Sequence, residues 1–345
     1  RAMLQRIGGG DDRRISFTVE VIALALSQDP ASAQARLDEL TQSPERQTRL
    51  TALQWAAHLH ENRGDGRAAT GLVERALALW RPEDGMWMRV NLEMQLAQLA
   101  GQRGDLEVAA RHAREALPDL LLIGAIDDAM DARSLVALDA IRRGDLTLAE
   151  EMADANTTGT DGVWSAGGAT VTLAVRAEVA LARGDIDLGL RTYREMATAM
   201  ARPLPEFGVM IAFFALYGLA NAAAAHAFHG QGEDLFDELA TLFPTAVDAD
   251  PERIDFPLIG AGVFALGAAG ALHGRLDPDD AAFLVCAALR FNYVRASPSM
   301  DWQVAVDAIE QVRPGAIRGA EKRVGDRKAS DLLPEVQALI ATLVD

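Results

Sequence analysis

The histidines of this chain are the residues with the clearest metal-binding chemistry, and their spacing does not support a site. His58 and His60 stand two positions apart, so on a helix their side chains point to different faces. His226 and His229 can share one helix face. Zinc would need two further ligands, and no cysteine or carboxylate set stands beside this second pair. We therefore predict no metal site at either pair.

The remaining reactive side chains also have ordinary interpretations. Asp127, Asp128 and Asp131 cluster where a helix is expected to start, and the helix dipole favours carboxylates there, so we interpret them as capping and solvated groups. Cys286 lies within an apolar run and is expected to be a buried, inert thiol. No serine stands in a nucleophile-elbow sequence, and no phosphate-binding glycine motif is present. We predict no catalytic residues, no cofactor and no metal, and hence no enzyme.

Composition narrows the class of protein further. The chain has 345 residues, half of them apolar, and a net charge of −17, which disfavours direct binding to nucleic acid. A single cysteine excludes an internal disulfide and fits a reducing cytoplasm. The uncharged stretch Phe207–Gly232 is long enough to cross a membrane. It is rich in alanine and glycine and contains polar side chains, so we predict a buried helix and no membrane association.

A repeat dominates the organisation of the chain. The tripeptide Arg-Gly-Asp recurs with its glycine at Gly64, Gly104, Gly144 and Gly184, which are spaced 40 residues apart. Glycine permits the left-handed backbone that ends a helix, and the following aspartate can cap the next one. Small residues stand seven positions before and five positions after each glycine, where they allow two helices to approach closely. Each repeat is therefore predicted to be a helix, a tight turn and a second helix.

The looser turns at Gly230 and Gly274 and an early irregular copy extend this pattern, and no alternating strand pattern is found. We predict an all-α, right-handed, tetratricopeptide-like solenoid of about seven helix pairs with a C-terminal helical cap. The predicted divisions are a linker or irregular start at residues 1–13, helical repeats at 14–300 and the cap at 301–345. Because the chain opens with Arg1 rather than methionine, we expect it to be part of a longer protein.

The turn and its small residues resemble the tetratricopeptide repeat, in the long variant found in bacterial signal-transduction ATPases with numerous domains. The stretch from Ala287 to Trp302, with Pro314-Gly315 and Gly325-Asp326-Arg327 beyond it, resembles the C-terminal end of actinobacterial antibiotic-regulatory transcription factors. Those proteins combine a winged-helix domain, a bacterial transcriptional-activator domain, a nucleotide-binding ATPase and helical repeats. Neither a nucleotide-binding lysine motif nor a basic recognition helix is present here, so the resemblance implies the regulatory repeat end alone.

The concave face of such a solenoid is where partners or ligands dock. The repeat register places a mixed set of polar side chains and one thioether on that face: Gln54, His58, Asn91, Met94, Gln98, Ser134, Arg142 and Glu178. This set is the predicted groove for a partner or ligand.

Three hypotheses for function follow. The first is a sensor and protein-interaction domain of a multidomain transcriptional regulator, which binds a protein, a peptide or a small effector and controls upstream ATPase and DNA-binding modules. The second is a free-standing adaptor or scaffold. The third is an enzyme or small-molecule carrier, which would require shifted ionisable groups near Asn221, His226 and His229.

Overall fold

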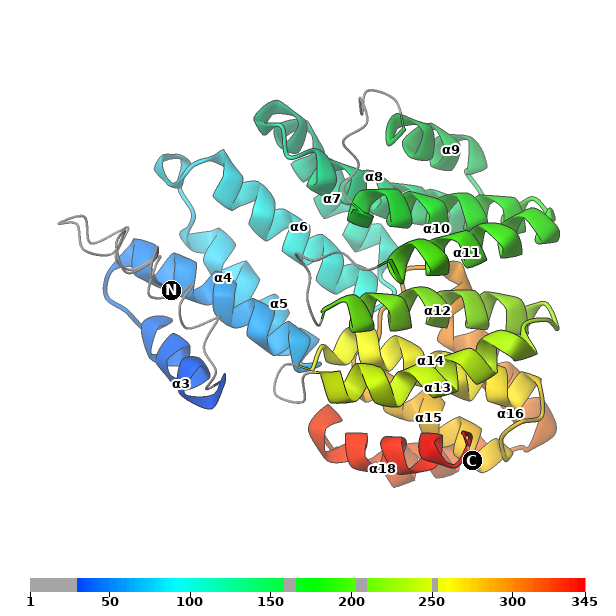
Figure 1. Cartoon of the computed structure of the whole chain (residues 1–345). Coiled ribbons are helices and arrows are strands. Elements are labelled where there is room, and N and C mark those ends of the chain that lie inside the picture. The colour runs from blue at the N-terminus through cyan, green and yellow to red at the C-terminus, as the bar shows by residue number, and fades with distance from the viewer. Residues whose placement is uncertain (1–29, 158–165, 203–209, 250–253, 345) are drawn as a thin grey trace.

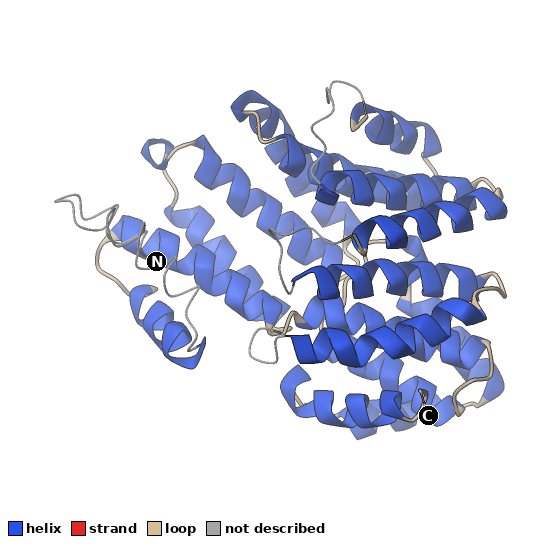
Figure 2. Cartoon of the chain, in the orientation of Figure 1, coloured by secondary structure: helices blue, strands red, loops and turns tan. Residues whose placement is uncertain are grey.

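The computed structural model describes residues 30–157, 166–202, 210–249 and 254–344. Within these ranges the chain forms α-helices, two short 3-10 turns and loops, with no strand (Figure 2). The helices are α3 (Pro30–Leu40), α4 (Arg46–Asn62), α5 (Gly66–Leu79), α6 (Met86–Gln102), α7 (Leu106–Ile123), α8 (Ile126–Arg142), α9 (Leu146–Ala155), α10 (Ala166–Ala182), α11 (Ile186–Met200), α12 (Met210–Phe228), α13 (Glu233–Ala249), α14 (Phe256–Leu272), α15 (Pro278–Arg290), α16 (Trp302–Val312), α17 (Ala316–Val324) and α18 (Ala329–Ala341). The predicted all-α helical-repeat solenoid is confirmed.

Consecutive helices from α4 to α15 form six antiparallel pairs stacked side by side (Figure 1). Helix α3 packs on α4 ahead of them. The first helix of the predicted early copy, residues 15–26, lies outside the described residues. Three helices, α16 to α18, follow the last pair.

The Arg-Gly-Asp turn ends one helix and begins the next. At Gly104 the backbone has φ +73°, and the Asp105 N–H donates to the carbonyl oxygen of Ala100, which closes the end of α6. The Asp105 carboxylate then accepts from the N–H of Val108 and caps α7. The other three copies repeat both bonds. The Arg-Gly-Asp tripeptide therefore sets the end of one helix and the start of the next at these four turns.

Small residues at the predicted positions lie where paired helices touch. Ala57, Ala97, Ala137 and Ala177 are fully buried. At Gly189 a Cβ atom would come within 2.6 Å of the Leu181 side chain. These positions therefore hold the helices of a pair at a distance that a larger side chain would not permit.

The array curls until its first and last pairs meet, because α14 contacts α4 (Figure 1). Among the first helices of the pairs, α6 contacts α8, α8 contacts α10, and α12 contacts α14. The chain then leaves α15 and runs back across the inner side of the curve. We call residues 291–301 the return segment; it includes the short turn η2 (Pro298–Met300) and leads into α16.

Helix α12 is the one helix, among the described residues, that is long and apolar enough to cross a membrane. It packs between α11, α13 and α14, and two thirds of its apolar window is buried within the protein. Its Asn221 is fully buried. Its apolar surface therefore contacts other helices of the array, as expected for a core helix of stacked repeats.

Candidate functional site

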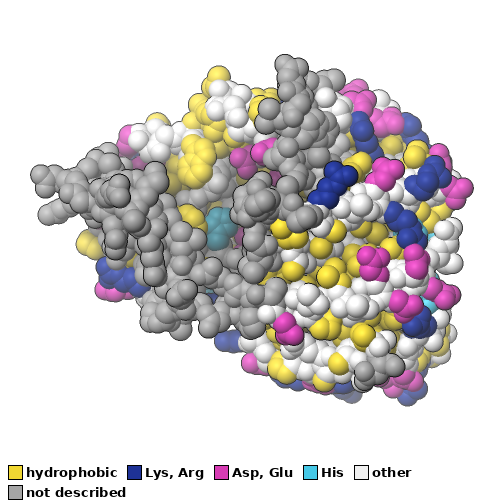
Figure 3. Space-filling model, viewed as in Figure 1, with side chains coloured by type: hydrophobic (Ala, Val, Ile, Leu, Met, Phe, Trp, Pro, Cys, Tyr) yellow, Lys and Arg dark blue, Asp and Glu magenta, His cyan; other side chains and the backbone are white. Residues whose placement is uncertain are grey.

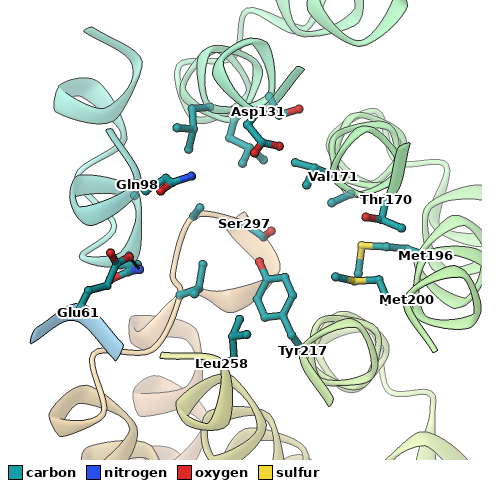
Figure 4. Close-up of a pocket in the computed structure, with 18 residues that line it drawn as sticks. Glu61, Gln98, Asp131, Thr170, Val171, Met196, Met200, Tyr217, Leu258 and Ser297 are labelled. Carbon is teal, nitrogen blue, oxygen red and sulfur yellow. Dashed lines mark hydrogen bonds between the residues drawn. The ribbon is translucent and has the colours of Figure 1, made fainter. Parts of the chain in front are cut away.

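A cavity of about 240 Å³ lies at the centre of the curled array, between the inner helices and the return segment (Figure 4). Every first helix from α4 to α14 contributes to its wall. Its lining residues are Glu61, Gln98, Gly101, Gln102, Asp131, Ser134, Leu135, Leu138, Thr170, Val171, Ala174, Met196, Met200, Tyr217, Leu258, Val294, Ala296 and Ser297. Most of this wall is apolar, with a few polar groups, which is the usual composition of a small-molecule site.

The return segment forms one side of the cavity and is held there by specific bonds. Asn292, whose backbone is left-handed with φ +53°, donates from its amide to the Gln102 side-chain oxygen at 2.8 Å. Arg295 donates from Nε to the backbone oxygen of Gln102 at 3.1 Å. The Tyr293 ring stacks on Phe264, with the ring centres 4.5 Å apart. The segment therefore occupies part of the concave groove in which an extended partner would dock.

Gln102 links the return segment to the first repeat. Its amide nitrogen donates to Glu61 of α4, while its amide oxygen accepts from Asn292. Glu61 and Gln102 are both largely buried, so this amide supplies the Glu61 carboxylate with a donor that water cannot easily replace. One side chain thus joins the two ends of the curled array.

Glu178 of α10 anchors the other end of the return segment. Its carboxylate accepts from the Tyr193 hydroxyl and from the Ser299 N–H, the latter at 2.8 Å. Burial raises the pKa of Glu178, and these two donors act in the opposite direction. Burial, together with the nearby Glu178 carboxylate, also raises the pKa of Tyr193 well above its usual range.

Asp131 is an ionisable group on the cavity wall whose pKa is strongly shifted. Burial, reinforced by the charges of Asp128 and Asp127 on the same helix, raises its pKa to about 7. It makes no hydrogen bond or ion pair with any residue that the structure describes. Burial and, to a lesser extent, the Asp131 charge raise the pKa of Tyr217 to about 12. In Figure 4 both side chains extend from the wall into the cavity.

The predicted groove residues have different locations. Gln98 and Ser134 line the cavity, although Ser134 donates its hydroxyl to the Met130 carbonyl at 2.9 Å. Glu178 is buried under the return segment rather than open to a partner. Arg142 is exposed and donates to the Gly104 carbonyl at 2.7 Å.

The other four lie on α4 and α6. Gln54 is buried and donates to Asn91 of the next repeat, so these two amides satisfy one another. Met94 is buried in the packing of α6 against its neighbours. His58 is partly exposed and lies edge-on to Trp55. The expected continuous groove is therefore divided between interior packing, the return segment and the cavity.

Asp131 is the functional candidate that the sequence pattern misassigned. Asp127 and Asp128 do lie in the first turn of α8, as expected for capping residues. Asp131 is one turn further on and faces the cavity. The sequence held a signal for this position. The repeat register placed Ser134 on the concave face, and Asp131 shares that face because residues three apart lie on the same side of a helix.

Among the described residues, the structure brings together a group of metal-ligating side chains that the sequence did not indicate. Glu93 of α6 and His112 and Glu115 of α7 place their ligand atoms within 4.8 Å of one another. His112 already pairs with Glu93, with Nδ1 2.7 Å from the carboxylate oxygen, and Arg111 lies 3.4 Å from its other ring nitrogen. These contacts satisfy the histidine without an ion.

Of the histidine pair considered in the sequence, His226 lies in the last turn of α12 and His229 lies just beyond the end of that helix. His226 is buried and approaches the Ala222 carbonyl at 2.7 Å, while Arg194 donates to its other nitrogen at 3.1 Å. Burial lowers the pKa of His226, which favours the neutral ring. Cys286 is buried as expected, and burial raises the pKa of its thiol to about 12.

No protein-family model and no curated protein sequence matches this chain. Among solved structures it is similar to a signal transduction ATPase with numerous domains from Pyrococcus horikoshii, which has a tetratricopeptide repeat sensor. The sequence identity is 14%, the TM-score is 0.43, and the match covers 92% of this chain and 53% of that one. The chain spans about half the length of that protein.

Proposed function

We propose that this chain is a regulatory sensor domain, which binds a small effector in the central cavity and responds by changing the closure of the curled array. The observation that carries this proposal is the composition of the cavity wall. Glu61 of the first pair, Tyr217 and Leu258 of the fifth and sixth pairs, and Ser297 of the return segment all reach the same space. A molecule bound there would contact both ends of the array at once.

Such contacts supply the energy for a switch. A ligand shifts a conformational equilibrium only by the difference between its affinities for the two states. An open array would separate α4 from α14 and the return segment, and the ligand would lose one side of its site. The ligand would therefore favour the closed array. The same geometry favours a small molecule over an extended peptide, because the return segment already occupies the groove.

The resemblance of residues 287–302 to antibiotic-regulatory transcription factors supports a place in a multidomain, cytoplasmic transcriptional regulator. In that setting the array would act on ATPase and DNA-binding modules elsewhere in the protein, without binding DNA itself or catalysing a reaction. On the face seen in Figure 3, basic and acidic side chains are interspersed over the outer ends of the helices, without a continuous basic patch among the described residues. This surface fits protein contacts better than phosphate contacts.

A ligand screen by thermal unfolding tests the sensor function. A compound that binds only the folded chain raises the free energy of unfolding by RT ln(1 + c/Kd), where c is its free concentration, so the unfolding midpoint rises with the logarithm of that concentration above Kd. In Ala174→Phe the added ring would fill part of the cavity, because Ala174 lines it. A genuine effector should stabilise the wild-type chain and lose that effect in Ala174→Phe. If every stabilising compound acts equally on both proteins, the cavity is not the effector site.

An adaptor is the second candidate, and a group of exposed apolar side chains favours it. Trp87 at the start of α6, Leu122 at the end of α7 and Ile126 at the start of α8 are 56%, 73% and 43% exposed. An ion pair between Arg89 and Asp119 links the same helix ends. An antibody against this chain, used on an extract of the source cell, distinguishes the candidates. A polypeptide much larger than 345 residues supports the regulator, and one of this size supports the adaptor.

A further inference from the structure

We propose that the cavity binds a small organic cation, a primary amine on an apolar body, and that Asp131 is the residue that recognises its ammonium group. The proposal rests on the sensor function proposed above and specifies the chemistry of its effector. It is carried by the distribution of charge, apolar surface and hydroxyl groups over the cavity wall.

The charges on the wall are all of one sign. Among the described lining residues, Asp131 and Glu61 are acidic, and there is no lysine, arginine or histidine. Glu61 is already provided with a donor by Gln102. The Asp131 carboxyl has no such donor among the described residues, so it can accept from an incoming group. A carboxylate effector would instead meet two acidic groups, and Glu61 and ionised Asp131 would both repel it in a poorly hydrated space.

The rest of the wall fits an apolar body. Leu135, Val171, Leu258 and the thioethers of Met196 and Met200 surround the space, and the methionines can adapt to ligands of different shape. In Figure 4 the two methionines lie on the α11 side, away from Asp131. A cavity of about 150 Å³ is known to hold benzene. The present cavity of about 240 Å³ therefore has room for a ring and a short aminoalkyl chain.

A primary ammonium group also suits the donors and acceptors present. It has three N–H donors and no acceptor, so it needs oxygen atoms around it. Asp131 supplies a carboxylate, and the Tyr217 hydroxyl extends into the same cavity from α12 (Figure 4). Burying the cation away from water is unfavourable unless it is paired and hydrogen-bonded, and these groups provide both. An alcohol of the same shape would gain the apolar contacts but not the ion pair.

Titration calorimetry with three matched probes tests the proposal on the intact chain. The probes are 2-phenylethylamine, 2-phenylethanol and phenylacetate, which share a ring and differ in charge. We expect the amine to bind at least about tenfold more tightly than the alcohol, and phenylacetate more weakly than either. Asp131→Asn should reduce amine affinity about tenfold or more while leaving alcohol affinity unchanged. Asp187→Asn is the matched control, because Asp187 is an exposed acid at the start of α11 that does not line the cavity.

The outcomes separate this proposal from the sensor function. If the alcohol binds the wild-type chain as tightly as the amine, or if Asp131→Asn keeps full amine affinity, the cation proposal is wrong while a cavity effector remains supported. If Ala174→Phe binds all three probes as the wild type does, their binding is outside the cavity and the cation proposal is again wrong. If no probe binds and the thermal screen finds no effector that depends on Ala174, both proposals fail.

Discussion

Replacing Gln102 by methionine removes the side-chain amide that joins the two ends of the array while keeping nearly the same volume. The amide donates to the Glu61 carboxylate and accepts from Asn292 at 2.8 Å. A hydrogen bond to a charged group contributes about 1.5–3 kcal/mol and a neutral one about 1 kcal/mol. The substitution also leaves Glu61 buried without this donor. We expect the free energy of unfolding to fall by about 2–4 kcal/mol.

Gln95 provides a control on the same helix with the opposite expectation. It is buried, and neither side-chain polar atom has a hydrogen-bond partner among the described residues. Gln95→Met should therefore leave stability unchanged or raise it, by up to about 3 kcal/mol. Urea unfolding followed by circular dichroism measures the free energy of unfolding of both variants. The dependence of that free energy on urea concentration should equal that of the wild type, so that a shift of the midpoint reports a change in stability. Equal losses of stability in the two variants would refute the assignment of Gln102 as the link between the ends.

Three further results are expected from the same structure. Gly66→Ala should lower the unfolding midpoint, because the added Cβ atom would lie 2.6 Å from the Asn292 side-chain amide. Gly71→Ala on the same helix should preserve or raise the midpoint, because its Cβ atom would have nothing within 4 Å. Equal effects of the two substitutions in thermal scans would contradict this reasoning. Between about pH 4 and 7 the folded Asp131 binds a proton that the unfolded residue has released, so its contribution to stability falls as pH rises. Urea titrations of Asp131→Asn should show a shallower fall over that window, and an unchanged slope would count against the raised pKa. Cys286 should resist iodoacetamide at pH 8 and react once the chain unfolds in urea, because burial raises the pKa of its thiol to about 12. Rapid labelling of the folded chain would show that the thiol is not inert.

The candidate site was only partly predictable from sequence. The helical register placed Gln98 and Ser134 on the inner face, and both line the cavity. It could not place the contributions of Tyr217 and Ser297, because the repeat spacing loosens after Gly184 and the return segment has no repeat pattern. It also assigned Glu178 to an open groove, although the return segment covers it.

The sequence by itself determined the repeat unit. The left-handed glycine, the aspartate cap and the small residues all lie within thirteen consecutive positions, so their spacing is enough to define each helix and its partner. That local chemistry specified the helices and turns of the four regular repeats.

Only the tertiary structure decided how the array closes and what its interior contains. Curvature accumulates from a small rotation at each repeat, which no single motif encodes. Contacts such as the Asn292–Gln102 hydrogen bond join residues 190 positions apart, and their partners become neighbours only after six pairs have stacked. The raised pKa of Asp131 has the same origin, because burial of a carboxyl depends on what the rest of the chain places around it.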